Sequence, residues 1–286
     1  MKGIILAGGN GTRLNPITIP YSKQLVPVYD KPLIYYPLST LMHLNIREIL
    51  IIVKSNQINN FSSLLKDGSQ FGLNIKYAIQ DVPNGIAEAL LIGEKFIMND
   101  SITLILGDNI FYGQNIEKNI KDFNLNNGSV IFLYQVKDPS KYGVVEFKKN
   151  KINKIIEKPK NPLSHYAVTG LYIYDKNAVK FAKKLKFSKR NELEITDLNN
   201  IYTKNKKINY VLLKKSSVWF DAGTTDSLLF ASQYIQAVQE RNNMLISSPE
   251  EIAYKKGFIS KNEFKILLNK MPQNYYSTIL HNILKS

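Results

Sequence analysis

Two cations stand in or near a glycine-rich loop at the start of the chain. Residues 8–13 read GGNGTR after a short apolar run, and Lys23 follows within the segment SKQ at 22–24. Glycine lets backbone N–H groups approach an anion closely, and the charges of Arg13 and Lys23 suit a triphosphate. The spacing fits neither the P-loop nor the dinucleotide-binding pattern. The residues therefore predict a phosphate-binding loop, with an ordinary turn after a strand as the alternative.

Two aspartates follow apolar runs of the kind that form buried strands. Asp108 stands in LGDN directly after such a run, and Asp221 stands in WFDAG after another. Open α/β sheets bind ligands at the carboxyl ends of their strands, and Mg²⁺ prefers carboxylate and phosphate oxygens. The two aspartates are therefore candidates for one magnesium site, although an aspartate after a strand is also a common helix cap or turn residue.

A third candidate is the dipeptide Glu157-Lys158, which precedes a proline. Its carboxylate suits sugar hydroxyls and its ammonium suits a sugar phosphate, while the alternative is an exposed ion pair. The three histidines, His43, His165 and His281, have no metal-ligand spacing. We therefore expect no catalytic histidine.

The first half of the chain predicts a scaffold in which strands and helices alternate. Buried strands are expected at residues 3–7, 49–53, 75–78 and 102–106, and helices at residues 32–44, 57–65 and 86–96. Residues 49–53 are all apolar, as expected for a strand that is covered on both faces. Such alternation implies parallel βαβ units in a layered α/β fold.

The second half of the chain is richer in strands and ends in helices. Strands are expected at residues 130–136, 142–147, 154–157, 168–174, 210–213 and 218–220, with a polar turn at 148–153. Helices are expected at residues 194–200, at 225–241 and from 249 onward. We expect an α/β core over residues 1–226, which includes the sugar-binding part, and a helical C-terminal extension over residues 227–286.

Composition indicates a folded protein of a reducing compartment. The 286 residues are 44% apolar, which suits a substantial core, and they include no cysteine. No apolar stretch approaches the roughly 18 residues of a membrane span, and the N-terminal apolar run is too short for a secretory signal. We therefore expect a cytoplasmic protein without a membrane partner.

The formal net charge of +15 comes mostly from lysine. Of the 38 basic residues only four are arginine, namely Arg13, Arg47, Arg190 and Arg241, and the lysines fall in scattered segments rich in lysine and asparagine. Nucleic-acid surfaces favour arginine because its guanidinium binds in a bidentate manner. We interpret the charge as a solvated surface that also attracts small anionic substrates, and we expect no nucleic-acid partner.

Together the motifs resemble a known enzyme family, the glucose-1-phosphate thymidylyltransferases, which make dTDP-glucose for rhamnose and other deoxysugars. The matching segments run in family order across the chain. They are LAGGNGTRL at 6–14, SKQL at 22–25, PVYDKP at 27–32, LGDNIFYG at 106–113, YGVVEF at 142–147, EKP at 157–159, AVTGLY at 167–172, ELEITD at 192–197 and PEEIAY at 249–254. The resemblance implies a Rossmann-like nucleotidyltransferase (GT-A-like) fold with a mixed central sheet.

The resemblance also implies a role for each matched site residue. The dTTP phosphates would contact Gly8, Gly11, Thr12, Arg13 and Lys23, with Gln24 and Asn109 near the substrates, and the thymine base would contact Gln80 and Gly85. Glucose would contact Gly143, Glu157 and Val168, and its phosphate Lys158. Asp108 and Asp221 would hold Mg²⁺, and Arg13, Lys23 and Lys158 would be the catalytic cations.

The chain departs from the family pattern at two places. Residues 80–86 read QDVPNGI where the family commonly has QPSPDGL, although Gln80 and Gly85 are kept. Lys215 stands where many members have an arginine that belongs to a second nucleotide site. The family enzymes are usually homotetramers, and this second site near a subunit interface mediates feedback.

The implied reaction is transfer of a thymidylyl group from dTTP to α-D-glucose 1-phosphate with release of pyrophosphate. Thymine and uracil differ by one methyl group, which is worth only about 1–3 kcal/mol in a pocket, so a UTP-using or other sugar-1-phosphate nucleotidyltransferase is the alternative enzyme. A catalytically silent nucleotide-sugar sensor is an alternative of another class, but it should have lost Lys23 or an acidic metal ligand. A nucleic-acid-binding protein is supported only by the net charge.

Overall fold

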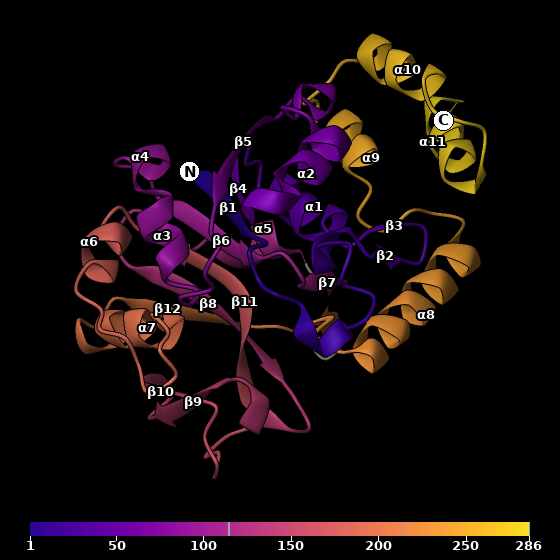
Figure 1. The fold of residues 1–286 in the computed structure, drawn as a ribbon. Helices are drawn as coiled ribbons and strands as arrows, with labels where there is room; N and C mark the ends of the chain where they lie inside the picture. The colour runs from indigo at the N-terminus through magenta and orange to yellow at the C-terminus, as the bar shows by residue number, and fades with distance from the viewer. Residues whose placement is uncertain (114, 215, 286) are drawn as a thin grey trace.

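A nine-stranded mixed sheet forms the centre of the protein (Figure 1). The computed structural model describes residues 1–113, 115–214 and 216–285, so Lys215, one of the departures noted above, lies outside the described residues. The main strand order is β10-β9-β11-β6-β1-β4-β5, and β8 pairs with both β11 and β12. The strands of this sheet are β1 (Lys2–Leu6), β4 (Glu48–Val53), β5 (Asn74–Ile79), β6 (Ile102–Leu106), β8 (Ser129–Gln135), β9 (Gly143–Lys148), β10 (Lys151–Glu157), β11 (Tyr166–Tyr174) and β12 (Ile208–Leu212).

The first half of the chain supplies the parallel part of the sheet. β1 lies between β4 and β6 and is parallel to both, and β4 is parallel to β5. These four strands confirm the predicted alternation of strands and helices. Because the strands are parallel, their carboxyl ends share one edge of the sheet, and both the glycine-rich loop and Asp108 follow strands that end there.

The second half adds antiparallel strands to this frame. β11 runs antiparallel to β6, β8 and β9, and β9 is antiparallel to β10. The predicted fold class, an α/β layered fold with a mixed central sheet, is therefore confirmed. Two further pairs of short strands lie outside the main sheet, β2 (Pro27–Val28) with β3 (Lys31–Pro32) and β7 (Ile110–Tyr112) with β13 (Val218–Phe220).

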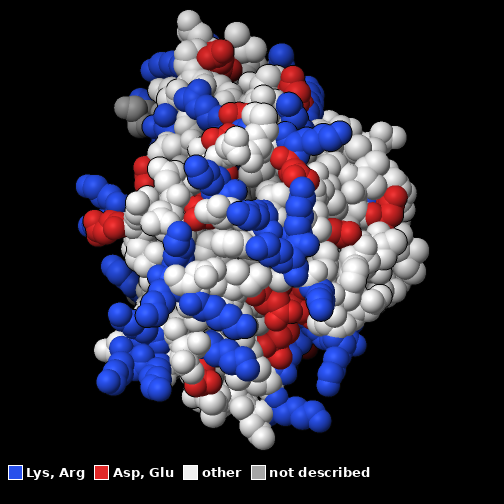
Figure 2. Space-filling model, turned by 90° about the vertical axis from the view of Figure 1, so that its left-hand side faces the viewer, with Lys and Arg blue, Asp and Glu red and all other residues white. Residues whose placement is uncertain are grey.

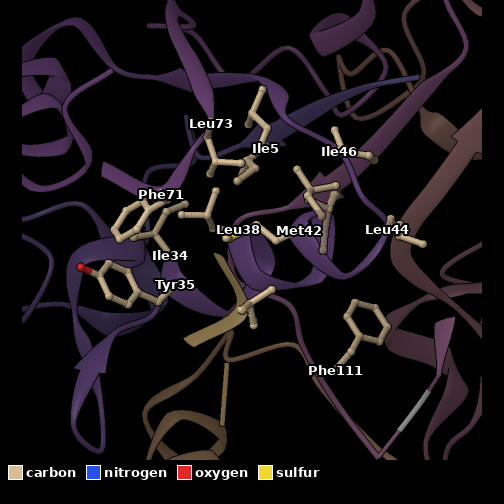
Figure 3. Packing of buried hydrophobic residues seen from close by; sticks show 14 of the residues in the cluster. Ile5, Ile34, Tyr35, Leu38, Met42, Leu44, Ile46, Phe71, Leu73 and Phe111 are labelled. Atoms are coloured by element: carbon tan, nitrogen blue, oxygen red, sulfur yellow. The ribbon is translucent and has the colours of Figure 1, made fainter. Parts of the chain in front are cut away.

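Helices cover both faces of the sheet, which explains the continuous apolar sequence of its central strands. In β4, Ile49, Ile51 and Val53 belong to one buried cluster, while Leu50 and Ile52 belong to the other. Figure 3 shows the first cluster around α1, where Ile5, Leu38 and Met42 lie close together. Alternate side chains of a strand point to opposite faces, so a strand buried on both sides has no polar positions.

The first face is covered by α1 (Tyr35–His43), α2 (Ile58–Leu65), α5 (Ile116–Ile120) and α9 (Pro249–Lys255). Helices α10 (Lys261–Asn269) and α11 (Tyr275–Lys285) pack on α9 and on each other, away from the sheet (Figure 1). The second face is covered by α3 (Glu88–Ile92), α4 (Glu94–Ile97), α6 (Ala178–Ala182) and α7 (Ile195–Lys204). The long helix α8 (Thr225–Asn242) packs on a third cluster with the β2–β3 segment. None of the described helices is both long enough and apolar enough to cross a bilayer.

Three predicted element boundaries are wrong. The helix expected at 32–44 begins only at Tyr35, because Pro32 pairs with Pro27 in a small sheet. The helix expected at 86–96 is divided at Gly93, which packs closely against Ile4. The polar turn expected at 148–153 is confined to two residues of positive φ, and β10 resumes immediately after them with its polar residues on an edge strand.

Candidate active site

The glycine-rich loop connects β1 to a short 3₁₀ helix, η1 (Thr12–Leu14). Gly11 has φ 61°, in the left-handed region that glycine tolerates, and its carbonyl oxygen accepts a hydrogen bond from Oγ1 of Thr18 at 2.9 Å. Among the described residues, no atom lies within 4 Å of the place where a Cβ on Gly9 would stand. The loop backbone is therefore open on the side of a cavity of about 260 Å³, which Gly9, Asn10, Gly11, Thr12 and Arg13 border.

A buried lysine reaches this cavity from a second segment. Lys23 opens the short helix η2 (Lys23–Leu25), and its Nζ donates to Oδ2 of Asp108 at 2.6 Å. In the described chain this is the single protein acceptor of Lys23, so two of its three N–H bonds stay free for a ligand. Gln24 lines the same cavity, and its Oε1 accepts a hydrogen bond from Ser22 at 2.7 Å.

Asn109 joins three separate parts of the site. Its Nδ2 donates to Oδ1 of Asp108 at 2.8 Å, and its Oδ1 accepts from the backbone N–H of Gly170 at 2.9 Å and from Nε1 of Trp219 at 2.6 Å. The side chain is only 2% exposed. Gly170 has to be a glycine, because a Cβ there would stand 2.5 Å from Oδ1 of Asn109. The structure therefore shows Asn109 as a support for Asp108, and its predicted contact with substrate stays a prediction.

The pairing of β13 with β7 brings the second aspartate to the first. Phe220 is opposite Ile110 in this ladder, so Asp221 follows one strand where Asp108 precedes the other. Burial raises the pKa of the Asp221 carboxyl, and the negative charge of Asp108 raises it further, whereas Tyr142, Lys23 and Arg13 act in the opposite direction. Both aspartates line the same cavity, so the charge of each acts on the other.

This pair fits a magnesium ion that takes its other ligands from substrate. Mg²⁺ prefers oxygen ligands, and in phosphate sites one or two carboxylates commonly hold it together with phosphate oxygens and water. Asp108 and Asp221 line one cavity, so these two aspartates would supply the carboxylate oxygens of such a site. No cluster of three or more metal-ligating side chains occurs within residues 1–113, 115–214 and 216–285, so a closed structural metal site is absent from them.

A larger cavity, of about 680 Å³, is also bordered by Asp108. Its polar lining includes Glu157, whose Oε2 accepts a hydrogen bond from Oγ1 of Thr196 at 2.6 Å. A Cβ on Gly143 would stand 3.3 Å from the same Oε2, so glycine leaves the carboxylate uncovered there. The predicted sugar and phosphate residues meet in this lining, namely Gly143, Glu157, Lys158 and Val168.

Arg190 reaches the same cavity and is held by three carboxylates. Its Nη2 lies 2.6 Å from Glu194, 3.2 Å from Glu192 and 3.4 Å from Glu157. Burial alone would raise the pKa of Glu194, but hydrogen bonds from Arg190 and Ser188 lower it overall. The guanidinium is thus fixed at one wall of the cavity with a full positive charge.

Lys158 follows Glu157 with an unusual backbone conformation. Its φ is 42°, which is uncommon for a residue with a side chain, and its N–H donates to the carbonyl oxygen of Tyr142 at 3.0 Å. Such conformations persist where surrounding structure imposes them and are frequent at functional sites. Lys158 agrees with this pattern, because it lines the larger cavity.

The residues predicted for base recognition lie beside the glycine-rich loop. Gln80 is buried at the end of β5, and a Cβ on Gly8 would stand 2.7 Å from its Oε1. Nε2 of Gln80 lies 3.5 Å from the carbonyl oxygen of Gly85, which has φ 109° and packs against the backbone of Leu193. Gly8, Gln80 and Gly85 therefore form one group, although none of them is part of the lining of the two cavities described above.

The structure thus brings most of the predicted residues together at the carboxyl edge of the parallel strands. The two cavities share two residues, Arg13 and Asp108. Sequence reasoning missed other polar or aromatic wall residues of the larger cavity, among them Tyr142, Arg190, Glu192, Glu194, Thr196 and Trp219. Three of them, Glu192, Glu194 and Thr196, belong to the matched segment ELEITD. That match could have pointed to them, but it assigns no role to a residue until its neighbours in space are known.

A separate cavity of about 420 Å³ lies near α1, α5 and α9. Its wall includes His43, Tyr112, Gly113, Ser248 and Lys256. Gly113 is close to Ser216 and Ser217, the residues that follow Lys215. This position is relevant to the predicted second nucleotide site, which stays a prediction because Lys215 is outside the described residues.

Comparison with known proteins gives consistent matches. A family model described as nucleotidyl transferase matches residues 2–238. The chain is 50% identical to a glucose-1-phosphate thymidylyltransferase of Neisseria meningitidis over 287 residues, with 100% of each chain covered. Among solved structures, a Bacillus anthracis protein in complex with sucrose matches with a TM-score of 0.77 and 44% identity over 82% of this chain and 94% of that one. UDP-glucose pyrophosphorylase in complex with UDP-glucose matches with a TM-score of 0.72 and 26% identity over 83% and 98%.

Proposed function

Because the chain belongs to the nucleotidyl transferase family, and within it to the glucose-1-phosphate thymidylyltransferases, we propose that it transfers a thymidylyl group from dTTP to α-D-glucose 1-phosphate. The products are dTDP-glucose, a precursor of deoxysugars, and pyrophosphate. The observation that carries the proposal is the pair of cavities that meet at Arg13 and Asp108. A reaction between a nucleoside triphosphate and a sugar phosphate needs two adjoining sites with a shared polar wall.

The smaller cavity suits the triphosphate. It is bordered by an open glycine backbone and by Arg13 and Lys23, against one carboxylate, Asp108. Backbone N–H groups and cations of this kind stabilise phosphate oxygens. Gln80 and Gly85 lie beside Gly8 of this loop, where the thymine base would contact them.

The larger cavity suits glucose 1-phosphate. Carboxylates such as Glu157 accept hydrogen bonds from sugar hydroxyls, while Lys158 neutralises the phosphate. A sugar phosphate has a second pKa near 6, roughly that of a phosphoserine, so the attacking phosphate is largely dianionic at neutral pH. The reaction therefore needs no general base, consistent with a site whose lining contains no histidine among the described residues.

In the reaction, a phosphate oxygen of glucose 1-phosphate attacks the α-phosphorus of dTTP, and the bond from that phosphorus to pyrophosphate breaks. Arg13, at the junction of the cavities, stabilises the charge that develops between the two substrates. Lys23 holds the triphosphate and Lys158 holds the attacking phosphate in line with it. Asp108 and Asp221 would hold Mg²⁺, which when bound would neutralise phosphate charge.

The type of its basic residues argues against a nucleic-acid-binding protein. Only four of the 38 basic residues are arginine, whose bidentate guanidinium nucleic-acid surfaces favour. In the face that Figure 2 shows, lysines and arginines are frequent at the centre and lower left, acidic residues lie among them, and the right-hand part is largely uncharged. We therefore explain the charge as a solvated surface that attracts anionic substrates.

We also propose a cytoplasmic homotetramer, as the family resemblance implies. Leu229 and Phe230 are each 60% exposed on α8, which suits a helix face that a second copy of the chain covers. The lack of cysteine fits a reducing compartment. Light scattering of the purified protein measures the oligomeric state directly, and a monomer at micromolar concentration would contradict this assembly.

The proposed activity is tested by pyrophosphate release from dTTP, UTP, dCTP and ATP, each with glucose 1-phosphate or a close isomer. We expect dTTP with glucose 1-phosphate to react fastest, UTP to react more slowly, and EDTA to abolish release. Asp108→Asn should lower kcat/KM on the order of 10²-fold and weaken the dependence on Mg²⁺. No release with any pair would falsify the enzymatic proposal, whereas release with UTP in preference to dTTP would support the alternative enzyme.

A further inference from the structure

One carboxylate fixes the orientation of two amide side chains beside the glycine-rich loop. Glu88, the first residue of α3, accepts a hydrogen bond from Nε2 of Gln80 at 2.6 Å on Oε2 and from Nδ2 of Asn84 at 2.9 Å on Oε1. An ionised carboxylate accepts hydrogen bonds and donates none. Both amides must therefore turn their NH₂ groups toward Glu88, and neither can rotate without losing a charge-assisted bond.

This orientation decides which atom of Gln80 is left for a ligand. With Nε2 committed to Glu88, Oε1 points to the backbone of Gly8, where a Cβ would stand 2.7 Å from it. In the described part of the chain, no donor is paired with Oε1 of Gln80. Because this oxygen is also not one of the buried polar atoms without a partner, it is accessible from outside the protein. Gln80 thus offers an acceptor, not a donor, beside the loop.

We propose that Glu88 is a positioning residue that sets base specificity by holding Gln80 with its carbonyl oxygen toward the base. Thymine and uracil carry a donor at N3–H, which Oε1 of Gln80 can accept. Cytosine has an unprotonated acceptor at N3, which would face Oε1 with two lone pairs opposed. The inference deepens the proposed function, because it rests on Gln80 contacting the base.

A purely structural role for Glu88 is less consistent with its surroundings. The segment that carries Asn84 and Gly85 has other anchors, since the N–H of Leu193 donates to the carbonyl oxygen of Asn84 at 2.6 Å and the N–H of Ala87 donates to that of Leu193 at 3.1 Å. These backbone bonds fix the path of the segment independently of the Glu88 side chain. A change at Glu88 should therefore alter the amide orientation more than the loop.

The first test replaces Glu88 with an isosteric amide. In Glu88→Gln, the new side chain can donate as well as accept, so Gln80 can turn over and present Nε2 to the base. We expect the ratio of the dissociation constants for dCTP and dTTP, measured by calorimetry with Mg²⁺, to fall about tenfold from its wild-type value. The matching ratio of kcat/KM values, from pyrophosphate release, should fall similarly.

The second test restores the orientation with a reciprocal exchange. In the double variant Asn84→Asp with Glu88→Gln, the new aspartate accepts from the amide NH₂ at position 88, which turns the carbonyl oxygen at 88 back toward Nε2 of Gln80. We expect the preference for dTTP to return to within about threefold of wild type. Glu94→Gln is the matched control, because Glu94 pairs with Lys183 on the surface and the substitution changes charge equally.

The outcomes separate this inference from the proposed function. Binding constants need no turnover, so a protein that binds dTTP but releases no pyrophosphate contradicts the reaction and leaves the specificity test intact. The inference is overturned by a wild-type protein without preference for dTTP over dCTP, or by an unchanged preference in Glu88→Gln. It is also overturned by a double variant that melts like wild type and still accepts dCTP as well as the single variant does.

Discussion

Two pairs of lysine and aspartate in the described chain each have a buried lysine but differ in what surrounds them. Lys23 pairs with Asp108 in the candidate active site, whereas Lys31 pairs with Asp30 between the β2–β3 segment and the C-terminal helices. The second pair, called here the closed pair, has a further protein partner, because Gln239 accepts from Lys31 at 3.1 Å and donates to Asp30 at 2.8 Å. The rings of Tyr36 and Tyr276 also lie 5.3 Å and 5.6 Å from Nζ of Lys31.

The pair in the active site is left open. Lys23 has a single protein acceptor in the described chain, Asp108 is 24% exposed, and the aspartate borders two cavities. Residue type and burial therefore do not separate a functional ion pair from a structural one. Asp30 and Lys31 also border a cavity, so what separates the two pairs is the hydrogen-bonding capacity that the protein leaves unused. The following substitutions test this distinction from the largest effect to the smallest.

Lys31→Ala should reduce stability and leave the chemistry intact. Removal of one partner from a buried ion pair typically costs about 3–5 kcal/mol, because the remaining charge stays buried. The free energy of unfolding in urea should fall by this amount, while kcat/KM per folded molecule stays near the wild-type value. A loss of activity in a fully folded variant would mean that the closed pair serves catalysis.

Lys23→Ala should lower activity and leave stability nearly unchanged, the opposite of Lys31→Ala. We expect kcat/KM for dTTP to fall on the order of 10²-fold or more, since a cation that stabilises the transition state is lost. The melting temperature should change little, because Asp108 is exposed enough to be hydrated after the lysine is gone. Lys148→Ala, an exposed lysine, is the control, and near-normal turnover of Lys23→Ala would remove this residue from the mechanism.

Glu250, whose carboxyl interacts with the charge of Lys31, makes the stability of the region around the closed pair depend on pH. Burial raises the pKa of this carboxyl, although hydrogen bonds from Tyr276 and Ser248 and the charge of Lys31 oppose the shift. An acid with a raised pKa in the folded state stabilises the fold when protonated, and this contribution is lost as pH rises through that pKa. Glu250→Gln should therefore stabilise the protein by about 1 kcal/mol at pH 8 and by less at pH 5. Equal melting-temperature shifts at both values would contradict this explanation.

Thr196→Val should have the smallest effect, because it removes only a hydrogen bond from a neutral hydroxyl that positions Glu157. Thr196 donates to Glu157 at 2.6 Å in the larger cavity, and a net hydrogen bond of this kind is worth about 0.5–1.5 kcal/mol. We expect the KM for glucose 1-phosphate to rise about threefold with kcat nearly unchanged. An effect on the KM for dTTP instead would place Glu157 on the wrong side of the site.

The sequence predicted the parallel strands well because their composition has a direct physical cause. A strand such as β4 is buried on both faces, so it reads as a continuous apolar run. The helix expected at 86–96 failed because the division at Gly93 depends on packing against β1, which local pattern does not contain. Edge strand β10 was shortened in the prediction because its polar residues are typical of a turn.

Single residues of the candidate site could be predicted from the sequence, but the way in which they come together in space could not. The resemblance supplied Arg13, Lys23 and Asp108, yet the approach of Asp221 to Asp108 depends on the pairing of β7 with β13. Arg190 was missed because its role appears only when the three carboxylates around it are known. Contacts between distant parts of a chain leave little signal in a single sequence.

The hydrogen bonds of Asn109 also have a consequence for how the chain folds. They join residues 61 and 110 positions apart, and Lys23 reaches Asp108 across 85 positions. Contacts of such high sequence separation form late, because closing long loops costs entropy before the contact stabilises the chain. Nucleotide binding should therefore appear only in the last phase of refolding, and a nascent chain that stops before Trp219 should lack it.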